Sequence, residues 1–147
     1  MKTALISMLI FFFSNLNFAW QSEKEAVQQV VQSAYVDGIH NRTGIEKISE
    51  GFHPDFETLD KRNDMLTKFP IYSWIETVEQ AMFSDETTTK KTTITAKFPL
   101  IDIAGDAAMA KVDLYRNEQH LFTNFLLLYK LEKGWKILSK TYYRIPE

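Results

Sequence analysis

Apolar residues recur every three or four positions in three segments of the first half of the chain. This spacing predicts amphipathic helices, because it places the apolar side chains on one face. The first helix begins at Ser22, a capping residue, and ends near Gly38. The second covers residues 45–50, and the third begins after Pro70 and ends before Ser84. The apolar stripe of the third helix consists of Ile71, Trp74, Ile75, Val78 and Met82.

Residues 92–145 alternate instead between apolar and polar positions. A period of two predicts β-strands. Turn signals divide this stretch into four strands, which we expect to pair as an antiparallel meander. The turn signals are Gly105-Asp106, Asn117-Glu118 and Lys133-Gly134.

The turn at residues 117–118 sets the register of the two strands that it joins. A two-residue turn places Leu114 opposite Leu121 and makes one face almost wholly apolar. We expect this face to pack against the helices.

The last hairpin has two alternative registers. A two-residue loop would place Lys136 and Lys140 on the inner face, whereas a three-residue loop ending in Gly134 turns both outward. Burying two unpaired ammonium groups costs several kcal/mol, so we expect the longer loop. The predicted inner face then consists of Leu121, Thr123, Phe125, Leu127, Tyr129, Trp135, Ile137, Thr141 and Tyr143.

The predicted outer face carries apolar side chains beside its lysines. An apolar strip on the open face of a sheet usually contacts another surface. We therefore expect a homodimer that pairs through this face. The predicted interface residues are Phe122, Leu126, Leu128, Leu138 and Tyr142.

The N-terminus has the zones of a secretory signal. Lys2 precedes an apolar run over residues 4–13, and small and polar residues lead to Ala19. The alternative is a membrane anchor, but this run is far shorter than the roughly 20 residues that a transmembrane helix needs. We expect residues 1–19 to be a cleaved signal peptide and residues 20–147 to form a single exported domain, periplasmic or extracellular.

The chain has 147 residues, of which 17 are Lys or Arg and 19 are Asp or Glu, and it has no cysteine. That length suits one domain, and the absence of cysteine excludes disulfides, thiolate metal sites and cysteine nucleophiles. The only adjacent basic pairs are at residues 61–62 and 90–91. We therefore expect no nucleic-acid partner and no stable membrane insertion after signal cleavage.

Three short motifs mark the ends of the predicted elements: YVDG at 35–38, FHPD at 52–55 and LEKGWKI at 131–137. With helices first and strands last, they make residues 23–144 resemble the nuclear-transport-factor-2-like superfamily, and within it the putative lumazine-binding family most closely. The resemblance implies an α+β fold in which three N-terminal helices pack on a strongly bent antiparallel sheet and leave a cone-shaped pocket. Relatives on this scaffold include isomerases, dehydratases and inert binding modules, so the fold does not decide the function.

His53 and Tyr35 are the candidate catalytic residues. Pro54 pushes His53 into an extended conformation, where an imidazole that faces a pocket can act as an acid or a base. The alternative is a histidine bonded to nearby backbone. The hydroxyl of Tyr35 either points into the cone as a donor or belongs to the core with its hydrogen bond satisfied.

Aromatic walls with a few hydrogen-bonding groups are typical of a small-molecule site, although the same residue types also build ordinary cores. The predicted inner strand faces contain no carboxylate or histidine, which argues against a known reaction. Asp113 and His120 fall on the outer face, and Asp37 and His40 are expected at a helix end or pocket rim. We expect no metal and no cofactor, because the histidines and acids lack ligand spacing. The predicted ligand-binding residues are Tyr35, Phe52, His53, Trp74, Thr123, Thr141 and Tyr143.

Two functions from different classes remain. The first is an exported binding protein whose cone accepts a small apolar or aromatic molecule. The second is a small isomerase or dehydratase that uses His53 as acid or base and Tyr35 as a hydrogen-bond donor. A structural or protein-interaction module is a further alternative.

Overall fold

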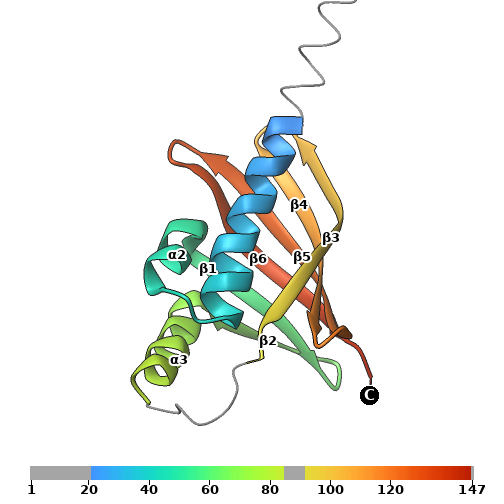
Figure 1. Cartoon of the computed structure of the whole chain (residues 1–147). Coiled ribbons are helices and arrows are strands. Elements are labelled where there is room, and N and C mark those ends of the chain that lie inside the picture. Colours follow the sequence, from blue (N-terminus) through green and yellow to red (C-terminus); the bar gives the residue numbers. More distant parts are fainter. Residues whose placement is uncertain (1–20, 85–91, 147) are drawn as a thin grey trace, which may run out of the picture.

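Six strands form one mixed sheet in the order β2-β1-β6-β5-β4-β3, and the helices lie against one of its faces (Figure 1). The computed structural model describes residues 21–84 and 92–146. The first helix covers residues 21–40 and contains the π-helical segment η1 (Val31–His40), and the other helices are α2 (Ile45–Gly51) and α3 (Ile71–Phe83). The strands are β1 (Phe52–Arg62), β2 (Met65–Pro70), β3 (Ile94–Ala104), β4 (Ala107–Arg116), β5 (Gln119–Leu131) and β6 (Gly134–Arg144).

The sheet is strongly curved, and the long first helix crosses its concave side with α2 and α3 beside it (Figure 1). The predicted α+β class, with helices packed on a bent sheet, is confirmed. One pairing was not predicted: β1 runs parallel to β6, whereas the other neighbouring strands are antiparallel. This pairing brings the segment after α2 next to the C-terminal strand.

The second half of the first helix is a π-helix. An α-helix bonds residue i to residue i+4, whereas a π-helix bonds residue i to residue i+5. The backbone N–H of Asn41 accordingly donates to the carbonyl of Val36 at 2.9 Å. Residues five apart therefore share a face, and the rings of Tyr35 and His40 meet edge to face with centroids 4.7 Å apart. The helix ends at His40 rather than at the predicted Gly38.

The short helix α2 packs closely on the first helix because two contact positions are glycine. A Cβ atom at Gly51 would overlap the Cβ atom of Ala34, and one at Gly38 would lie 2.8 Å from Cγ1 of Ile48. Ala34 and Ile48 are fully buried at this contact. The close approach fixes the position of η1 above the sheet.

A β-hairpin occupies residues 52–70, where the sequence pattern predicted only an extended bend. Its strands are joined by Asn63 and Asp64, whose φ angles are 48° and 64°. Positive φ at both central residues is typical of a type I′ turn, which matches the twist of paired strands. The four strands predicted within residues 92–145 are present as β3 to β6, and this hairpin adds two strands that were not predicted.

A β-bulge changes the register of the β4–β5 hairpin. The predicted turn at residues 117–118 is present, and Tyr115 pairs with His120 as that turn requires. The bulge then places Leu114 opposite Phe122 instead of the predicted Leu121. A slip of one residue turns every following side chain to the other face of the sheet.

The last hairpin has the shorter loop, because Leu131 pairs with Gly134. The predicted three-residue loop is therefore wrong. Trp135 and Ile137 are nevertheless buried, as predicted, with exposed fractions of 4% and 0%.

A second bulge follows Ile137 in β6. Beyond it, Lys140 pairs with Leu126 and is only 6% exposed, on the face that the helices cover. Thr141 and Tyr143 face the opposite way and are exposed. The prediction that Thr141 and Tyr143 point inward while Lys140 points outward is wrong, because it assumed uninterrupted alternation along β6.

The two bulges also overturn the predicted interface. Leu126 and Leu128 are buried in the core, Phe122 and Tyr142 face the helices, and Leu138 is the unpaired bulge residue. The predicted interface residues are therefore wrong, and homodimerisation itself stays a prediction. The apolar side chains that the outer face exposes are Leu100, Phe125, Leu127, Tyr129, Leu131 and Tyr143.

One hydrophobic core joins the helices to the inner face of the sheet. Within residues 21–84 and 92–146, no helix is long and apolar enough to cross a bilayer. The predicted signal peptide, residues 1–19, lies outside the described residues, and its cleavage stays a prediction.

Candidate functional site

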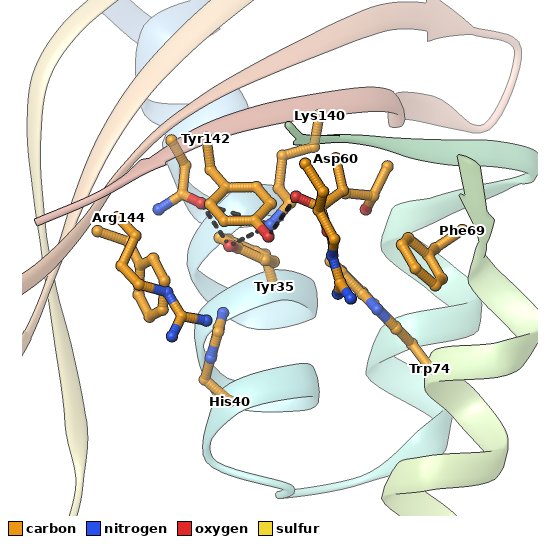
Figure 2. Close-up of a pocket in the computed structure, with 12 residues that line it drawn as sticks. Tyr35, His40, Asp60, Phe69, Trp74, Lys140, Tyr142 and Arg144 are labelled. Atoms are coloured by element: carbon orange, nitrogen blue, oxygen red, sulfur yellow. Dashed lines mark hydrogen bonds and ion pairs between the residues drawn. The ribbon is translucent and has the colours of Figure 1, made fainter. Parts of the chain in front are cut away.

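A cavity of about 290 Å³ lies between the helices and the inner face of the sheet (Figure 2). It lies where the first helix and α3 meet the strands β1, β2, β5 and β6. The side chains that line it are Tyr35, His40, Thr58, Asp60, Arg62, Phe69, Trp74, Phe122, Asn124, Lys140, Tyr142 and Arg144.

Two neighbouring strands supply one wall of this cavity. Alternate residues of a strand point to the same face, and Thr58 of β1 is the direct partner of Lys140 of β6. The wall therefore depends on the parallel β1–β6 pairing and on the second bulge. Its residues are Thr58, Asp60 and Arg62 from β1, and Lys140, Tyr142 and Arg144 from β6.

The helices supply the opposite wall. Tyr35 and His40 extend from η1 toward β6, and Trp74 extends from α3 (Figure 2). The ring of Trp74 stacks on that of Tyr35 with centroids 6.2 Å apart, and it packs against Phe56 at 5.7 Å. These contacts give the cavity a rigid aromatic side.

Lys140 is the most unusual side chain of the site. Its Nζ atom donates to the hydroxyl oxygen of Tyr35 at 3.1 Å and lies 3.5 Å from Oδ1 of Asn124. It also lies 5.2, 4.8 and 4.4 Å from the ring centroids of Tyr35, Trp74 and Tyr142, within the range of cation–π contacts. Burial lowers the pKa of Lys140 to about 7, although nearby Asp60 opposes this shift. Near neutral pH, a large fraction of this side chain is therefore an uncharged amine.

The hydroxyl of Tyr35 is held by the sheet as well as by Lys140. It donates to Oδ1 of Asn124 at 2.8 Å, and the amide of Asn124 donates to the carbonyl of Val112 at 3.2 Å. Burial raises the pKa of Tyr35 above its ordinary value. Tyr35 therefore keeps its proton, and its oxygen remains an acceptor for Lys140.

Asp60 is buried but fully engaged by its neighbours. The hydroxyl of Tyr142 donates a hydrogen bond to Oδ1 of Asp60 at 2.8 Å, and Nε of Arg62 donates one to Oδ2 at 2.8 Å. These hydrogen bonds, from Arg62 and then Tyr142, hold the pKa of Asp60 below its usual range. Asp60 therefore stays ionised and neutralises Arg62.

Two buried polar atoms of the lining, Nε2 of His40 and Oγ1 of Thr58, have no hydrogen-bond partner among the described residues. Leaving such an atom unsatisfied typically costs about 1–3 kcal/mol. Burial, helped by the charges of Lys140 and Arg116, lowers the pKa of His40 to about 3. His40 is therefore neutral at physiological pH.

The lining carries more positive than negative charge. Arg62, Lys140 and Arg144 face a single acid, Asp60. Arg144 lies over the ring of Phe122, with Cζ 5.3 Å from its centroid, and has no carboxylate within 4.0 Å in the described part of the chain. The cavity is therefore suited to an anionic group.

A broader groove of about 620 Å³ lies between the first helix and the β5–β6 hairpin. Two of its lysines already have partners: Lys130 contacts Glu23 at 2.6 Å, and Lys136 donates to the carbonyl of Glu50. Because these polar groups satisfy one another, the groove is a weaker candidate than the cavity.

The structure places only some of the residues predicted to bind ligand at the cavity. Tyr35 and Trp74 line the cavity, and Phe52 is buried in the aromatic core with its ring centroid 6.4 Å from that of Trp74. His53 is outside the lining, and its Nδ1 accepts the backbone N–H of Asp55 at 3.2 Å, which matches the backbone-bonded alternative. The residues that the bulges turn to the outer face are Thr123, Thr141 and Tyr143.

The prediction that no carboxylate or histidine faces inward is wrong. Asp60 belongs to the strand that the sequence pattern missed, and His40 reaches the cavity only because η1 is a π-helix. The alternation of polar residues at 58, 60 and 62, followed by an Asn-Asp turn, is the signal that could have revealed the strand. Among the residues described, no group of three or more His, Asp or Glu side chains could hold a metal ion.

Residues 22–143 match the family described as Putative lumazine-binding. An NTF2-like protein of unknown function from Shewanella baltica OS155 has a TM-score of 0.67 at 24% identity, covering 87% of this chain and 98% of that chain. An NTF2-like protein of unknown function from Silicibacter pomeroyi DSS-3 has a TM-score of 0.63 at 20% identity, covering 82% and 94%. The CaMKII hub of S. rosetta has a TM-score of 0.58 at 13% identity, covering 82% and 95%.

A comparison with curated proteins gives no match. The structural likenesses are below 25% identity and show the fold alone. The family match covers most of the chain, including every residue that lines the cavity except Arg144. The chain therefore belongs to the Putative lumazine-binding family, within the nuclear-transport-factor-2-like superfamily.

Proposed function

We propose that this protein binds a small anionic molecule with an aromatic or otherwise apolar body in the cavity between the helices and the sheet. The observation that carries the proposal is the position of Lys140, which is 6% exposed and faces the cavity. In residues 21–84 and 92–146, no carboxylate lies within 4.0 Å of its Nζ atom. Burial disfavours the charged form of this amine, and an anionic ligand would stabilise that form by supplying a carboxylate or similar partner.

The guanidinium of Arg144 gives the ligand a second cationic contact. Asp60 neutralises Arg62 through the 2.8 Å hydrogen bond, so it does not compensate Arg144. A guanidinium binds a carboxylate through two parallel hydrogen bonds, which favours a carboxylate as the anionic group. The unpartnered Nε2 of His40 and Oγ1 of Thr58 provide further positions for polar atoms of the ligand.

The apolar body of the ligand fits the aromatic part of the lining. Tyr35, Phe69, Trp74 and Phe122 present ring surfaces to the cavity. A volume of about 290 Å³ is just below the range of roughly 300–1,000 Å³ that is usual for ligand pockets. We therefore propose a ligand of one or two rings rather than a long chain.

Isothermal titration calorimetry tests the proposal with a panel of one- and two-ring aryl carboxylates, each beside its neutral primary amide. At least one carboxylate should bind with a Kd below about 1 mM, and its amide should bind at least about tenfold more weakly. K140M should abolish this preference for the carboxylate. The matched control is K133M, which removes an exposed lysine outside the cavity and should leave binding unchanged.

Two results would contradict the proposal. One is that no carboxylate of the panel binds at millimolar concentration, which would favour a structural or protein-interaction module. The other is that amides and carboxylates bind equally well, which would show that the cations do not select the ligand.

We also propose that the protein is exported after removal of residues 1–19. The charged, apolar and small-residue zones of the N-terminus support this. Intact mass spectrometry of protein from its own host should find a chain that begins at Trp20 in the periplasm or the medium. An unprocessed chain that starts at Met1 inside the cell would count against export.

The alternative function as an isomerase or dehydratase that uses His53 gains no support from the geometry. His53 does not line the cavity, and its Nδ1 is bonded to the backbone of Asp55. Tyr35 does line the cavity, but its hydroxyl already donates its hydrogen bond to Oδ1 of Asn124. Neither residue is placed as that mechanism requires.

A further inference from the structure

The amine of Lys140 has a geometry suited to covalent chemistry with the ligand. Resting on the binding function proposed above, we propose that Lys140 forms a reversible imine with an aldehyde or ketone that carries a carboxylate. The cavity gives a carbonyl compound space next to Nζ. The aromatic rings of Tyr35, Trp74 and Tyr142 surround the amine and limit its contact with bulk water.

The groups nearest to the amine are neutral. Its hydrogen-bond partners are the hydroxyl of Tyr35 from η1 and the amide oxygen of Asn124 from β5. Of the ionisable groups that line the cavity, Asp60 of β1 is bonded to Tyr142 and Arg62, and His40 of η1 is neutral. Among the described residues, no carboxylate lies within 4.0 Å of Nζ, and the more distant Asp60 opposes the effect of burial on the pKa of Lys140 without cancelling it.

These two hydrogen bonds also orient the nitrogen. An uncharged amine has two N–H groups and one lone pair, and the N–H groups are directed toward the oxygens of Tyr35 and Asn124. The lone pair then points in a remaining tetrahedral direction and is available to a carbonyl carbon in the cavity. A lysine with an ordinary pKa is only about 0.1% uncharged at pH 7.5. Burial lowers the pKa of Lys140 to about 7, so this fraction becomes large.

The reaction needs no oxidant or reductant. The lone pair of Nζ attacks the carbonyl carbon, a C–N bond forms, and the carbonyl oxygen becomes a hydroxyl of the carbinolamine. The C–O bond then breaks, and the oxygen leaves as water with the two protons that the amine carried. Water reverses the same steps, so the imine is reversible.

The position of Arg144 defines the other end of the ligand. Arg144 is four residues beyond Lys140 on the same face of β6, and the two lie on opposite sides of Tyr142 (Figure 2). A carboxylate bound by Arg144 leaves the opposite end of the ligand near Lys140. The inferred substrate class is therefore a carbonyl compound whose carboxylate and carbonyl are separated by an apolar spacer such as one aromatic ring.

The test uses 4-carboxybenzaldehyde as the probe and sodium cyanoborohydride to reduce any imine to a stable secondary amine. The purified protein is treated at pH 7.5, and the labelled position is found by intact mass and peptide mapping. We expect one carboxybenzyl group per chain, located on Lys140. Benzaldehyde, which lacks the carboxylate, should label Lys140 at least tenfold more slowly, and R144Q should remove this difference.

Variants provide the controls. K140M should lose the label at least tenfold, whereas K133M should keep it. If K140M does not fold, Y35F retains the amine but removes its hydrogen-bond acceptor and should label several-fold more slowly. Label spread evenly over exposed lysines, or equal labelling by both aldehydes, would overturn the inference.

The outcome also separates this inference from the binding proposal. If aryl carboxylates bind but Lys140 is not labelled, only the imine is wrong. If neither binding nor labelling occurs, both are wrong.

Discussion

The Nζ atom of Lys140 lies 3.1 Å from the hydroxyl oxygen of Tyr35, although the two residues are 105 positions apart in the sequence. The hydroxyl of Tyr35 donates a hydrogen bond to Oδ1 of Asn124 at 2.8 Å, so a single hydroxyl links the first helix to β5 and β6. This link joins the helical layer to the sheet at the base of the cavity.

Replacing Tyr35 by phenylalanine should lower the stability of the protein. Y35F leaves the buried Oδ1 of Asn124 without its strongest donor, and we expect the free energy of unfolding to fall by about 1–2 kcal/mol. Urea denaturation followed by tryptophan fluorescence measures the change. The matched control is Y72F, because Tyr72 is 61% exposed and should change stability by less than about 0.5 kcal/mol. Equal effects of the two substitutions would show that the hydroxyl of Tyr35 is not engaged.

Removing the buried amine should instead stabilise the protein. Lys140 has a pKa of about 7 in the folded chain, against roughly 10.4 for an ordinary lysine. Below pH 7, Lys140 is charged in both states, so the folded protein is destabilised by the full cost of burying an ammonium group. Between the two pKa values, the unfolded chain binds a proton that the folded chain does not. The stability of the wild type therefore rises with pH in this window.

K140M removes that cost and its pH dependence. We expect the free energy of unfolding to increase by about 1–4 kcal/mol at pH 6, and the gain to shrink toward pH 10. Denaturation at both pH values measures it, with K133M as the control of an exposed lysine. A variant that is destabilised at pH 6 would contradict the uncompensated burial of Lys140.

His40 should make the protein sensitive to moderate acid. Its pKa is lowered from 6.5 to about 3, so between these values the unfolded chain binds a proton that the folded chain does not. The contribution is fully present above pH 6.5 and is lost as the pH falls, with a slope of up to about 1.4 kcal/mol per pH unit. Lys140 and Arg116 face this imidazole and add to the effect.

Stability measured between pH 6.5 and 4.5 isolates this contribution from most carboxylates. H40N should flatten the slope, whereas H53N should preserve it because His53 lies outside the cavity. Identical slopes for the wild type and H40N would refute the buried, neutral state of His40.

Two adjacent tyrosines test the reversed faces of β6. Tyr142 donates to the buried Asp60 at 2.8 Å, whereas Tyr143 is 58% exposed on the other face. Y142F should cost about 1–2 kcal/mol of unfolding free energy, and Y143F should stay within about 0.5 kcal/mol. If denaturation showed a larger loss of stability for Y143F than for Y142F, Tyr143 would face inward, as the register without bulges predicts.

The sequence pattern predicted the three helices, the α+β class and the turns at residues 105–106 and 117–118, because these features depend on local spacing. Tyr35 and Trp74 could be placed on the sides of their helices that face the sheet by the same means. A one-residue error in a predicted position matters less in a helix than in a strand, because nearby positions on a helix still share a broad face. In a strand, a one-residue error reverses the face.

The errors in the candidate site arise from the two bulges. Both faces of β5 carry large apolar residues, such as Leu126 on the inner face and Leu127 on the outer face, so hydrophobicity could not identify the inner one. The remaining criterion was the cost of burying Lys140, and it favoured the wrong face. Lys140 is buried at the cavity despite this cost. Functional sites are the places where a protein is expected to depart from the rule that charged side chains stay exposed.

The β1–β2 hairpin was missed for a different reason. Its second strand, β2, is largely exposed, and it lies at the edge of the sheet, so apolar alternation is weak there. Because this hairpin carries Thr58, Asp60 and Arg62, half of the sheet wall of the cavity could not be predicted.

The measurement that tests the account most directly is the titration of the Lys140 side chain by NMR. Protein labelled with ¹³C at lysine Cε is titrated from pH 5 to pH 11, and the Lys140 signal is assigned by its loss in K140M. We expect a midpoint near pH 7, well separated from the exposed lysines. A midpoint near the ordinary value of about 10.4 would show that the amine is solvated and charged, and it would contradict both the ligand site and the imine.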